Sequence, residues 1–243
     1  MITAFWGARH GQGVTTTLVQ VAAALLSAGQ PVRIVDADPD SADLGLFHAH
    51  QDAPLFDSLV DDAERHDVRW PEWTRWYGDS EAVLGNTKRQ FPLAASAEAA
   101  SRVVTALVAI DEPNVHILCD IGSGLRDYLT VAFLSVAPRV VVVTKTDIPS
   151  AISTQTALGY VAPRLAAEDR VVALIGEGGV TSEILKDVSQ WRPVKIAETQ
   201  QAARMRSTGQ IVQQRQYAGL LDVVMPNGPQ ERRERSRWRG KKS

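Results

Sequence analysis

The sequence predicts an α/β protein with a doubly wound, mainly parallel sheet, on the strength of two observations. First, its short apolar runs are continuous rather than alternating, which is typical of strands covered on both faces of a sheet. Second, patterns with helical spacing separate several of these runs, so strands and helices alternate along the chain. The runs predict strands at residues 2–6, 32–35, 115–119, 140–144, 171–175 and 194–196.

The remaining expected elements are one short strand and three helices. The strand is expected at residues 82–84. The clearest helix pattern covers residues 15–28, because its apolar side chains share one face and Gly29 follows as a C-terminal stop. Further helices are expected at residues 95–110 and 148–161.

The distribution of charge separates a tail from the rest of the chain. The formal net charge of the 243 residues is −2, but residues 230–243 hold seven Lys and Arg against two Glu, a net of +5, which leaves −7 on the remainder. We therefore expect one domain over residues 1–225 and a basic, disordered tail over residues 226–243. The single cysteine excludes an internal disulfide framework, and no apolar run approaches the roughly 20 residues of a membrane-spanning helix.

Residues 7–17 read G-A-R-H-G-Q-G-V-T-T-T and lie between the first expected strand and the first expected helix. This is the placement of a phosphate-binding loop, because a strand leads to a glycine turn and the N–H groups of the next helix face that turn. Gly11 and Gly13 permit the tight backbone that such a loop needs. Thr15 stands where a hydroxyl binds Mg²⁺, and Thr16 follows it at the helix start.

One position of this loop departs from a P-loop. A P-loop carries lysine after its last glycine, whereas this chain has Val14, which offers a phosphate neither charge nor donor. Arg9 and His10 are basic side chains of the same loop, but they stand at other positions. Taken by itself, the loop is also compatible with a tight turn that binds no ligand.

Acidic residues follow two further strands. Asp36 and Asp38 come directly after the strand expected at residues 32–35, and Asp120 ends the strand expected at residues 115–119. The carboxyl ends of parallel strands meet at one edge of a sheet, so these side chains are expected beside the glycine loop. There they can order the waters of a Mg²⁺ ion or position a nucleophilic water, while the N–H group of Gly124 faces a terminal phosphate.

Together the three motifs resemble the ParA/MinD family of deviant Walker-A ATPases, which are P-loop proteins. The family loop K-G-G-x-G-K-[ST]-T corresponds to residues 9–16, and its D-x-D corresponds to Asp36 and Asp38. Its D-x-P-x-G corresponds to Asp120–Gly124, with Gly122 in place of proline. The L-G-L at residues 44–46 is similar to the MinD and flagellar- or pilus-positioning side of the family, and further similar segments extend the resemblance to about residue 215.

The resemblance implies roles for the loop and the acidic residues. Asp38 and Arg9 are expected to serve catalysis, with Arg9 in place of the lysine that reaches across the family dimer. Thr15, Asp36 and Asp120 are expected to hold Mg²⁺ with ATP or ADP. The residues expected to bind the nucleotide are Gly11, Gln12, Gly13, Val14, Thr15, Thr16 and Gly124.

The leading hypothesis is a nucleotide-binding protein with a degenerate Walker A loop. It acts as a positioning switch or scaffold for a partner assembly, with weak or no ATP hydrolysis, because Val14 removes a charge contact to the transferred phosphoryl group. One alternative is an active ATPase switch that uses Arg9 in place of both lysines. Another is a DNA-partition protein that binds DNA non-specifically through its dimer face and the tail.

Partners follow from the same resemblance. We expect a homodimer with an unknown protein partner, located in the cytoplasm and open to recruitment to a membrane or nucleoid surface. Residues 232–242, from Arg232 to Lys242, carry the basic side chains that would contact DNA or an anionic membrane. They are equally consistent with a solvated tail.

Two other features have less specific interpretations. Trp70, Trp73 and Trp76 recur at every third residue, and we interpret them as a helical stripe that packs on the body, with a partner-docking surface as the alternative. No serine has an evident His and Asp partner in the sequence, so a hydrolase triad is not expected.

Overall fold

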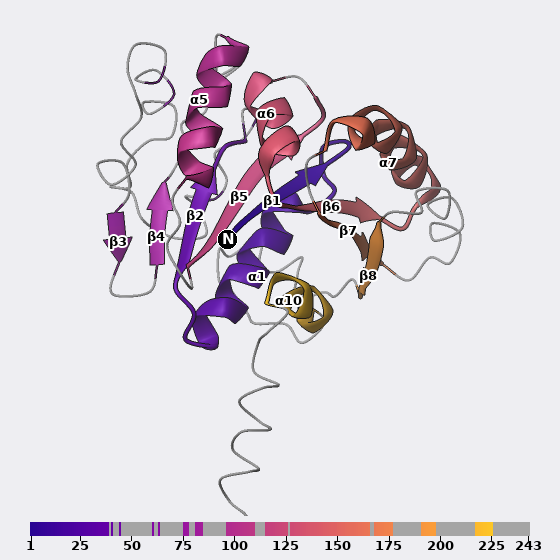
Figure 1. Ribbon diagram of the computed structural model, residues 1–243. Coiled ribbons are helices and arrows are strands. Elements are labelled where there is room, and N and C mark those ends of the chain that lie inside the picture. The colour runs from indigo at the N-terminus through magenta and orange to yellow at the C-terminus, as the bar shows by residue number, and fades with distance from the viewer. Residues whose placement is uncertain are drawn as a thin grey trace, which may run out of the picture.

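A computed structural model describes residues 1–38, 40, 44, 60, 63, 75–77, 81–84, 96–109, 115–125, 127–165, 168–176, 191–197 and 217–225. Within these residues eight strands form one sheet in the order β3-β4-β2-β5-β1-β6-β7-β8. Only the pair of β3 and β4 is antiparallel among the strand pairs described, and helices lie on both sides of the sheet (Figure 1). The expected doubly wound, mainly parallel α/β fold is confirmed.

The strands are β1 (Ile2–Gly7), β2 (Val32–Asp36), β3 (Arg75–Tyr77), β4 (Glu81–Leu84), β5 (His116–Ser123), β6 (Arg139–Lys145), β7 (Asp169–Ile175) and β8 (Arg192–Ile196). The helices are α1 (Val14–Ser27), α5 (Ala97–Val108), α6 (Tyr128–Val136), α7 (Ile148–Val161) and α10 (Ala218–Val224), with a 3-10 turn at Ala162–Arg164. All seven expected strands and all three expected helices are therefore present.

The tryptophan segment is where the expectation was wrong. Trp76 lies in β3, an antiparallel edge strand, and not in a helix. A three-residue spacing of aromatic side chains does not distinguish a helix from a short strand with flanking loops, and aromatic residues favour strands. Trp70 and Trp73 lie outside the described residues, as does the basic tail at residues 226–243.

Helix α6 was not expected. Its sequence is almost uniformly apolar, so no helical period stands out, and its N-terminus is marked by Asp127. The Asp127 carboxylate accepts a hydrogen bond from the N–H of Leu129 at 2.7 Å, which is the capping interaction that aspartate provides before a first turn.

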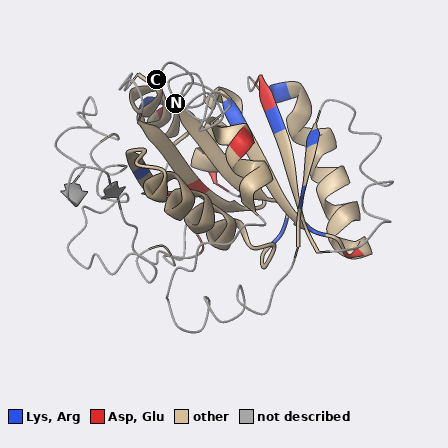
Figure 2. Cartoon of the chain, turned by 90° about the horizontal axis from the view of Figure 1, so that it is seen from below, with Lys and Arg blue, Asp and Glu red and all other residues tan. Residues whose placement is uncertain are grey.

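Two apolar layers cover the two faces of the sheet. Helices α5, α6 and α7 pack on one face, where Val103, Phe133 and Leu158 belong to one core cluster. Helices α1 and α10 pack on the other face, where Leu18 and Leu220 belong to a second cluster. Figure 2 shows that most of the described ribbon is tan, so acidic and basic residues are a minority in the helices and strands, as a sheet between two helical layers requires.

Helix α1 ends as its sequence predicts. Gly29 has φ of 69°, in the left-handed region that suits glycine. Its N–H donates to the carbonyl of Leu26 at 2.9 Å, and the N–H of Gln30 donates to the carbonyl of Leu25 at 3.0 Å. This pair of bonds is a Schellman motif, which satisfies carbonyl groups that the last helical turn leaves free.

Strand register brings the predicted acidic residues to one edge of the sheet. Strand β5 lies between β2 and β1, and it pairs Asp120 with Asp36 on one side and with Phe5 on the other. The loop that leaves β1 after Gly7 therefore begins beside both carboxylates. No helix among the described residues is both long and apolar enough to cross a membrane.

Candidate functional site

The loop between β1 and α1 has the backbone of an anion-binding turn. Gly11 and Gly13 have φ of 74° and 87°, a region that glycine adopts without strain. Gly13 directly precedes α1, and no side chain in the described part of the chain caps the free N–H groups of the first turn. Such N–H groups, at the positive end of a helix, bind phosphate oxygens in many proteins.

Val14 turns its side chain into the protein rather than toward the loop. It is 8% exposed and belongs to the same core cluster as Leu18 and Val143. A Cβ atom on Gly7 would lie 2.9 Å from Val14 Cγ2, so the contact between the start of the loop and the start of α1 depends on glycine. Val14 therefore packs the loop without offering it a charge, while Thr15 is half-buried and Thr16 is buried.

Gln12 fixes the loop to the next strand and helix. Its side chain is 2% exposed, and its Oε1 accepts a hydrogen bond from the backbone N–H of Lys145 at 2.7 Å. Its Nε2 donates to Ser150 Oγ at 3.2 Å. Ser150 in turn donates through Oγ to Asp147 Oδ2 at 2.8 Å, and its N–H donates to Asp147 Oδ1 at 2.8 Å. The amide thus connects the middle of the loop to the cap of α7.

Three buried carboxylates stand beside this loop. Asp36, Asp38 and Asp120 are 1%, 7% and 1% exposed. Burial raises the pKa of Asp36 well above its usual value, and the negative charges of Asp120 and Asp38 raise it further. Asp36 Oδ2 accepts no hydrogen bond from the described residues although it is buried. A cation in this position would relieve both the repulsion and the missing contact.

The arrangement suits Mg²⁺ held together with phosphate. Among the described residues no group of three or more His, Cys, Asp and Glu side chains is placed to enclose a metal ion by itself. Mg²⁺ commonly takes one or two carboxylates and completes its shell with water and substrate phosphates. Asp36 and Asp120 fit the carboxylate role, and the half-buried Thr15 at the start of α1 fits the hydroxyl role.

A β-bulge shapes the turn that carries Asp120. The register between β1 and β5 shifts between Phe5 and Gly7, so β5 holds one extra residue there. Gly122 lies in the bulge with φ of 67°, and its N–H donates to Asp120 Oδ1 at 3.0 Å. A Cβ atom on Gly122 would collide with the Asp38 carboxylate. Proline, which the family motif has here, could provide neither this N–H nor this φ.

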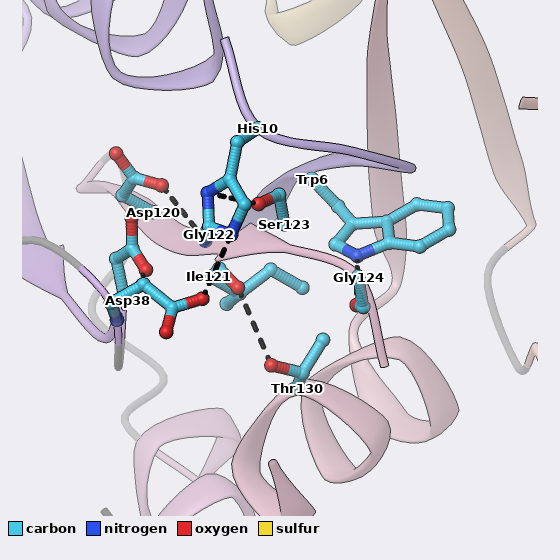
Figure 3. Close-up of polar contacts among 10 residues, drawn as sticks. Trp6, His10, Asp38, Asp120, Ile121, Gly122, Ser123, Gly124 and Thr130 are labelled. Carbon is cyan, nitrogen blue, oxygen red and sulfur yellow. Dashed lines mark hydrogen bonds and ion pairs between the residues drawn. The ribbon is translucent and has the colours of Figure 1, made fainter. Parts of the chain in front are cut away.

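Both the N–H and the carbonyl of Gly124 form hydrogen bonds with residues of β1. Its N–H donates to the carbonyl of Gly7 at 2.9 Å, and its carbonyl accepts from Trp6 Nε1 at 2.7 Å (Figure 3). The N–H group expected to face a terminal phosphate therefore has a partner in the loop base.

His10 joins three segments at this edge of the sheet. Its Nδ1 lies 2.9 Å from Ser123 Oγ, and its Nε2 lies 3.3 Å from Asp40 Oδ2. Figure 3 shows the imidazole above the turn of Ser123, with Asp38 and Asp120 beside it. Ser123, His10 and Asp40 are thus in contact, which the sequence does not indicate. The arrangement is unsuited to acyl transfer, however, because the neighbouring carboxylates oppose an oxyanion and the Asp40 side chain is 38% exposed.

Arg9 is exposed at the rim of the loop and close to Asp147. The pKa of Asp147 is lowered mainly by its hydrogen bonds from the Ser150 N–H and hydroxyl, and the charge of Arg9 lowers it further. Arg9 is therefore part of the same edge as Gln12 and the start of α7.

Comparison with known proteins rests on structure. No family model matches the chain, and no curated protein matches its sequence. Apo McdA from Cyanothece matches with a TM-score of 0.71 at 16% identity, covering 95% of this chain and 98% of that chain. MinD in the MinC:MinD complex of Aquifex aeolicus matches with a TM-score of 0.70 at 15% identity, covering 93% of this chain and 94% of that chain.

A protein assigned to plasmid partition in Borrelia burgdorferi, solved with AMPPNP, also matches, with a TM-score of 0.70 at 13% identity, covering 93% of this chain and 96% of that chain. The chain has a ParA/MinD-like fold. The resemblance read from its motifs is thereby confirmed at the level of fold, since identities this low show the fold alone.

Within this ParA/MinD-like fold, the structure brings together most of the predicted site residues. Asp36, Asp38 and Asp120 lie together, and His10, beside Gly11 in the loop, contacts Ser123 of the strand that carries Asp120. Sequence reasoning missed the contacts of His10, Asp40 and Ser123 and the tether formed by Gln12. A partial signal for the tether was present, because aspartate is favoured directly before a helix and so marks Asp147, whose carboxylate accepts from the N–H of Ser150.

Proposed function

We propose that this protein binds ATP or ADP with Mg²⁺ and acts as a ParA/MinD-like positioning switch or scaffold with weak or no ATP hydrolysis. The observation that carries the proposal is the meeting of Asp36 and Asp120, paired in register, with the glycine loop that precedes α1. In addition, solved structures with this fold include the Borrelia protein with AMPPNP and a MinD from Pyrococcus horikoshii with Mg-ADP.

In this proposal different residues around the loop hold the phosphates and the Mg²⁺ ion of the nucleotide. Backbone N–H groups of residues 11–16 would hold the phosphates, and Thr15, Asp36 and Asp120 would hold Mg²⁺. Mg²⁺ would neutralise negative charge on the phosphates. Asp38, 7% exposed in the same group, is placed to orient a water, and Arg9 is an exposed cation at the rim.

Weak hydrolysis follows from the inward position of Val14. Transfer of a phosphoryl group is accelerated mainly by positive charge placed at the developing negative charge, and removal of one such contact commonly costs about 3–4 kcal/mol, or roughly a hundredfold to thousandfold in rate. Val14 provides no such contact and packs in the core instead. Binding loses less, because backbone N–H groups and Mg²⁺ remain as contacts.

A face for self-association lies beside the loop. Helices α6 and α7 follow β5 and β6, and exposed apolar side chains stand at their starts: Tyr128 is 50%, Val131 40%, Ile148 54% and Ile152 51% exposed. We place the proposed homodimer contact on this face, and we propose that the protein partner binds to the dimer. Sedimentation with and without Mg-ATP tests it, because Ile152→Asp should prevent the dimer and leave nucleotide binding intact. A dimer that survives this change contradicts the placement.

The experiment that tests the proposed function is a calorimetric titration with Mg-ATP and Mg-ADP, combined with phosphate release. The proteins are wild type, Val14→Lys and the uncharged control Val14→Met. We expect binding of both nucleotides by all three proteins and faster turnover only in Val14→Lys. Absence of binding to wild type contradicts the proposal.

Rapid turnover by wild type would instead support the active-ATPase alternative. In that case Arg9→Ala should abolish hydrolysis, because this alternative uses Arg9 in place of the lysines. The DNA-partition alternative rests on residues 232–242, which lie outside the described residues. It predicts salt-sensitive DNA binding that deletion of residues 230–243 removes.

A further inference from the structure

His10 is a basic side chain of the loop whose contacts the proposed function does not use. It stands at the first glycine of the family pattern K-G-G-x-G-K, so the imidazole occupies space that a glycine leaves empty. It bridges the segment after β2, through Asp40, and the turn at the end of β5, through Ser123. The ring therefore ties together the three segments that surround the proposed nucleotide phosphates.

The two ring nitrogens have different partners. A carboxylate can only accept a hydrogen bond, so we assign the ring hydrogen to Nε2, which lies 3.3 Å from Asp40 Oδ2, within ion-pair distance. In the neutral ring Nδ1 then accepts from the Ser123 hydroxyl at 2.9 Å. The His10 side chain is 59% exposed and the Asp40 side chain 38% exposed, so a ligand can reach this pair of side chains.

We propose that His10 binds the terminal phosphate of a bound nucleoside triphosphate. An oxygen of that phosphate takes the place of the Asp40 carboxylate as the acceptor of the hydrogen on Nε2. This inference rests on the proposed function. It names the side chain by which the site distinguishes a triphosphate from a diphosphate.

Two other groups near the loop are not available for this contact. Val14 has no donor and lies in the core. The N–H of Gly124 already donates to the carbonyl of Gly7 at 2.9 Å. Arg9, the other basic side chain of the loop, acts on Asp147, whereas the imidazole of His10 lies above the Ser123 turn (Figure 3).

A terminal phosphate and Asp40 compete for the same hydrogen. Both are anionic acceptors, and two negative groups on one N–H repel each other. A triphosphate therefore displaces the Asp40 carboxylate from His10. A diphosphate lacks the competing group, so the contact of His10 with Asp40 persists.

The test compares affinities for Mg-AMPPNP and Mg-ADP by calorimetry, in full-length wild type, His10→Gly, His10→Gln and Asp40→Asn. Loss of a hydrogen bond to a charged group reduces affinity by about tenfold to a hundredfold. We expect His10→Gly to lose about that much affinity for Mg-AMPPNP while its affinity for Mg-ADP stays within about threefold. His10→Gln keeps a donor and should lose less. Asp40→Asn removes the competing charge and should bind Mg-AMPPNP more tightly, with Mg-ADP unchanged.

The outcomes separate this inference from the proposed function. If wild type binds both nucleotides and His10→Gly keeps the wild-type ratio of the two affinities, then His10 does not bind the terminal phosphate. The proposed nucleotide site would still be supported. An equal loss for both nucleotides in His10→Gly also overturns the inference, because the residue would then serve the loop in general. If wild type binds neither nucleotide, the proposed function fails and this inference fails with it.

Discussion

Replacing Gln12 with methionine tests whether its buried amide fixes the loop to α7. Methionine keeps nearly the same length and volume but has no strong hydrogen-bonding atom. The change removes the bond from the Lys145 N–H at 2.7 Å and the bond to Ser150 Oγ at 3.2 Å. It leaves the Lys145 N–H without its protein acceptor in a partly buried position.

The expected loss of stability follows from these contacts. Two hydrogen bonds contribute about 1 kcal/mol each, and a donor left unpaired adds about 1 kcal/mol where water reaches it in part. We therefore expect Gln12→Met to reduce the free energy of unfolding by about 2–3 kcal/mol. For a chain of this length that corresponds to a fall in Tm of about 4–12 °C.

Urea unfolding monitored by circular dichroism measures the effect, and a double-mutant cycle assigns it. Ser150→Ala removes one partner, and we expect a coupling of about 1 kcal/mol between the two changes. Ser153→Ala is the matched control, because the hydroxyl of Ser153 in the same helix makes only an exposed bond to the Pro149 carbonyl and should change stability by less than about 0.5 kcal/mol. A Gln12→Met protein within about 0.5 kcal/mol of wild type would refute the reasoning.

Three further predictions concern single residues. Gly122→Ala should destabilise by at least about 1–2 kcal/mol in urea unfolding, because its φ is 67°, whereas the helical control Gly159→Ala, with open space at its Cβ, should be neutral or stabilising. Asp36→Asn should raise Tm at pH 7, because the pKa of Asp36 is raised in the folded state and its ionisation opposes folding. This gain in Tm should shrink as pH falls toward 3.8, the ordinary pKa of aspartate. A Tm difference between the two proteins that does not depend on pH would contradict the prediction. Arg139→Met should reduce the free energy of unfolding by about 2–4 kcal/mol, because it removes the contact of 2.6 Å with Asp169 and a bond to the Val224 carbonyl of α10. Asp169→Asn should reduce it by less, and equal reductions in the two variants would contradict this prediction.

The sheet could be predicted from the sequence because its strands are apolar on both faces. Continuous runs such as residues 140–144 leave few alternatives to a buried strand. The edge strand β3 was missed because Arg75–Tyr77 is short and lacks such a run. Helix α6 was missed because its own residues are apolar on every face, so its sequence shows no amphipathic period.

The candidate site was predictable where its residues follow strands, and unpredictable where it depends on side-chain reach. Asp36 and Asp120 were placed together correctly because parallel strands present their carboxyl ends at one edge. The contact of His10 with Ser123 joins residues 113 positions apart and follows a bulge in β5, which no local pattern indicates. The inward direction of Val14 likewise required the packing of the core to be known.

The most direct measurement of the central claim is an equilibrium titration of wild-type protein with Mg-ATP, repeated in EDTA and with Asp120→Asn. The account predicts saturable binding of one nucleotide per chain, weakened by EDTA and by the substitution, because a carboxylate and Mg²⁺ hold the phosphates together. Absence of binding at millimolar ATP, or binding that neither EDTA nor Asp120→Asn affects, would contradict it.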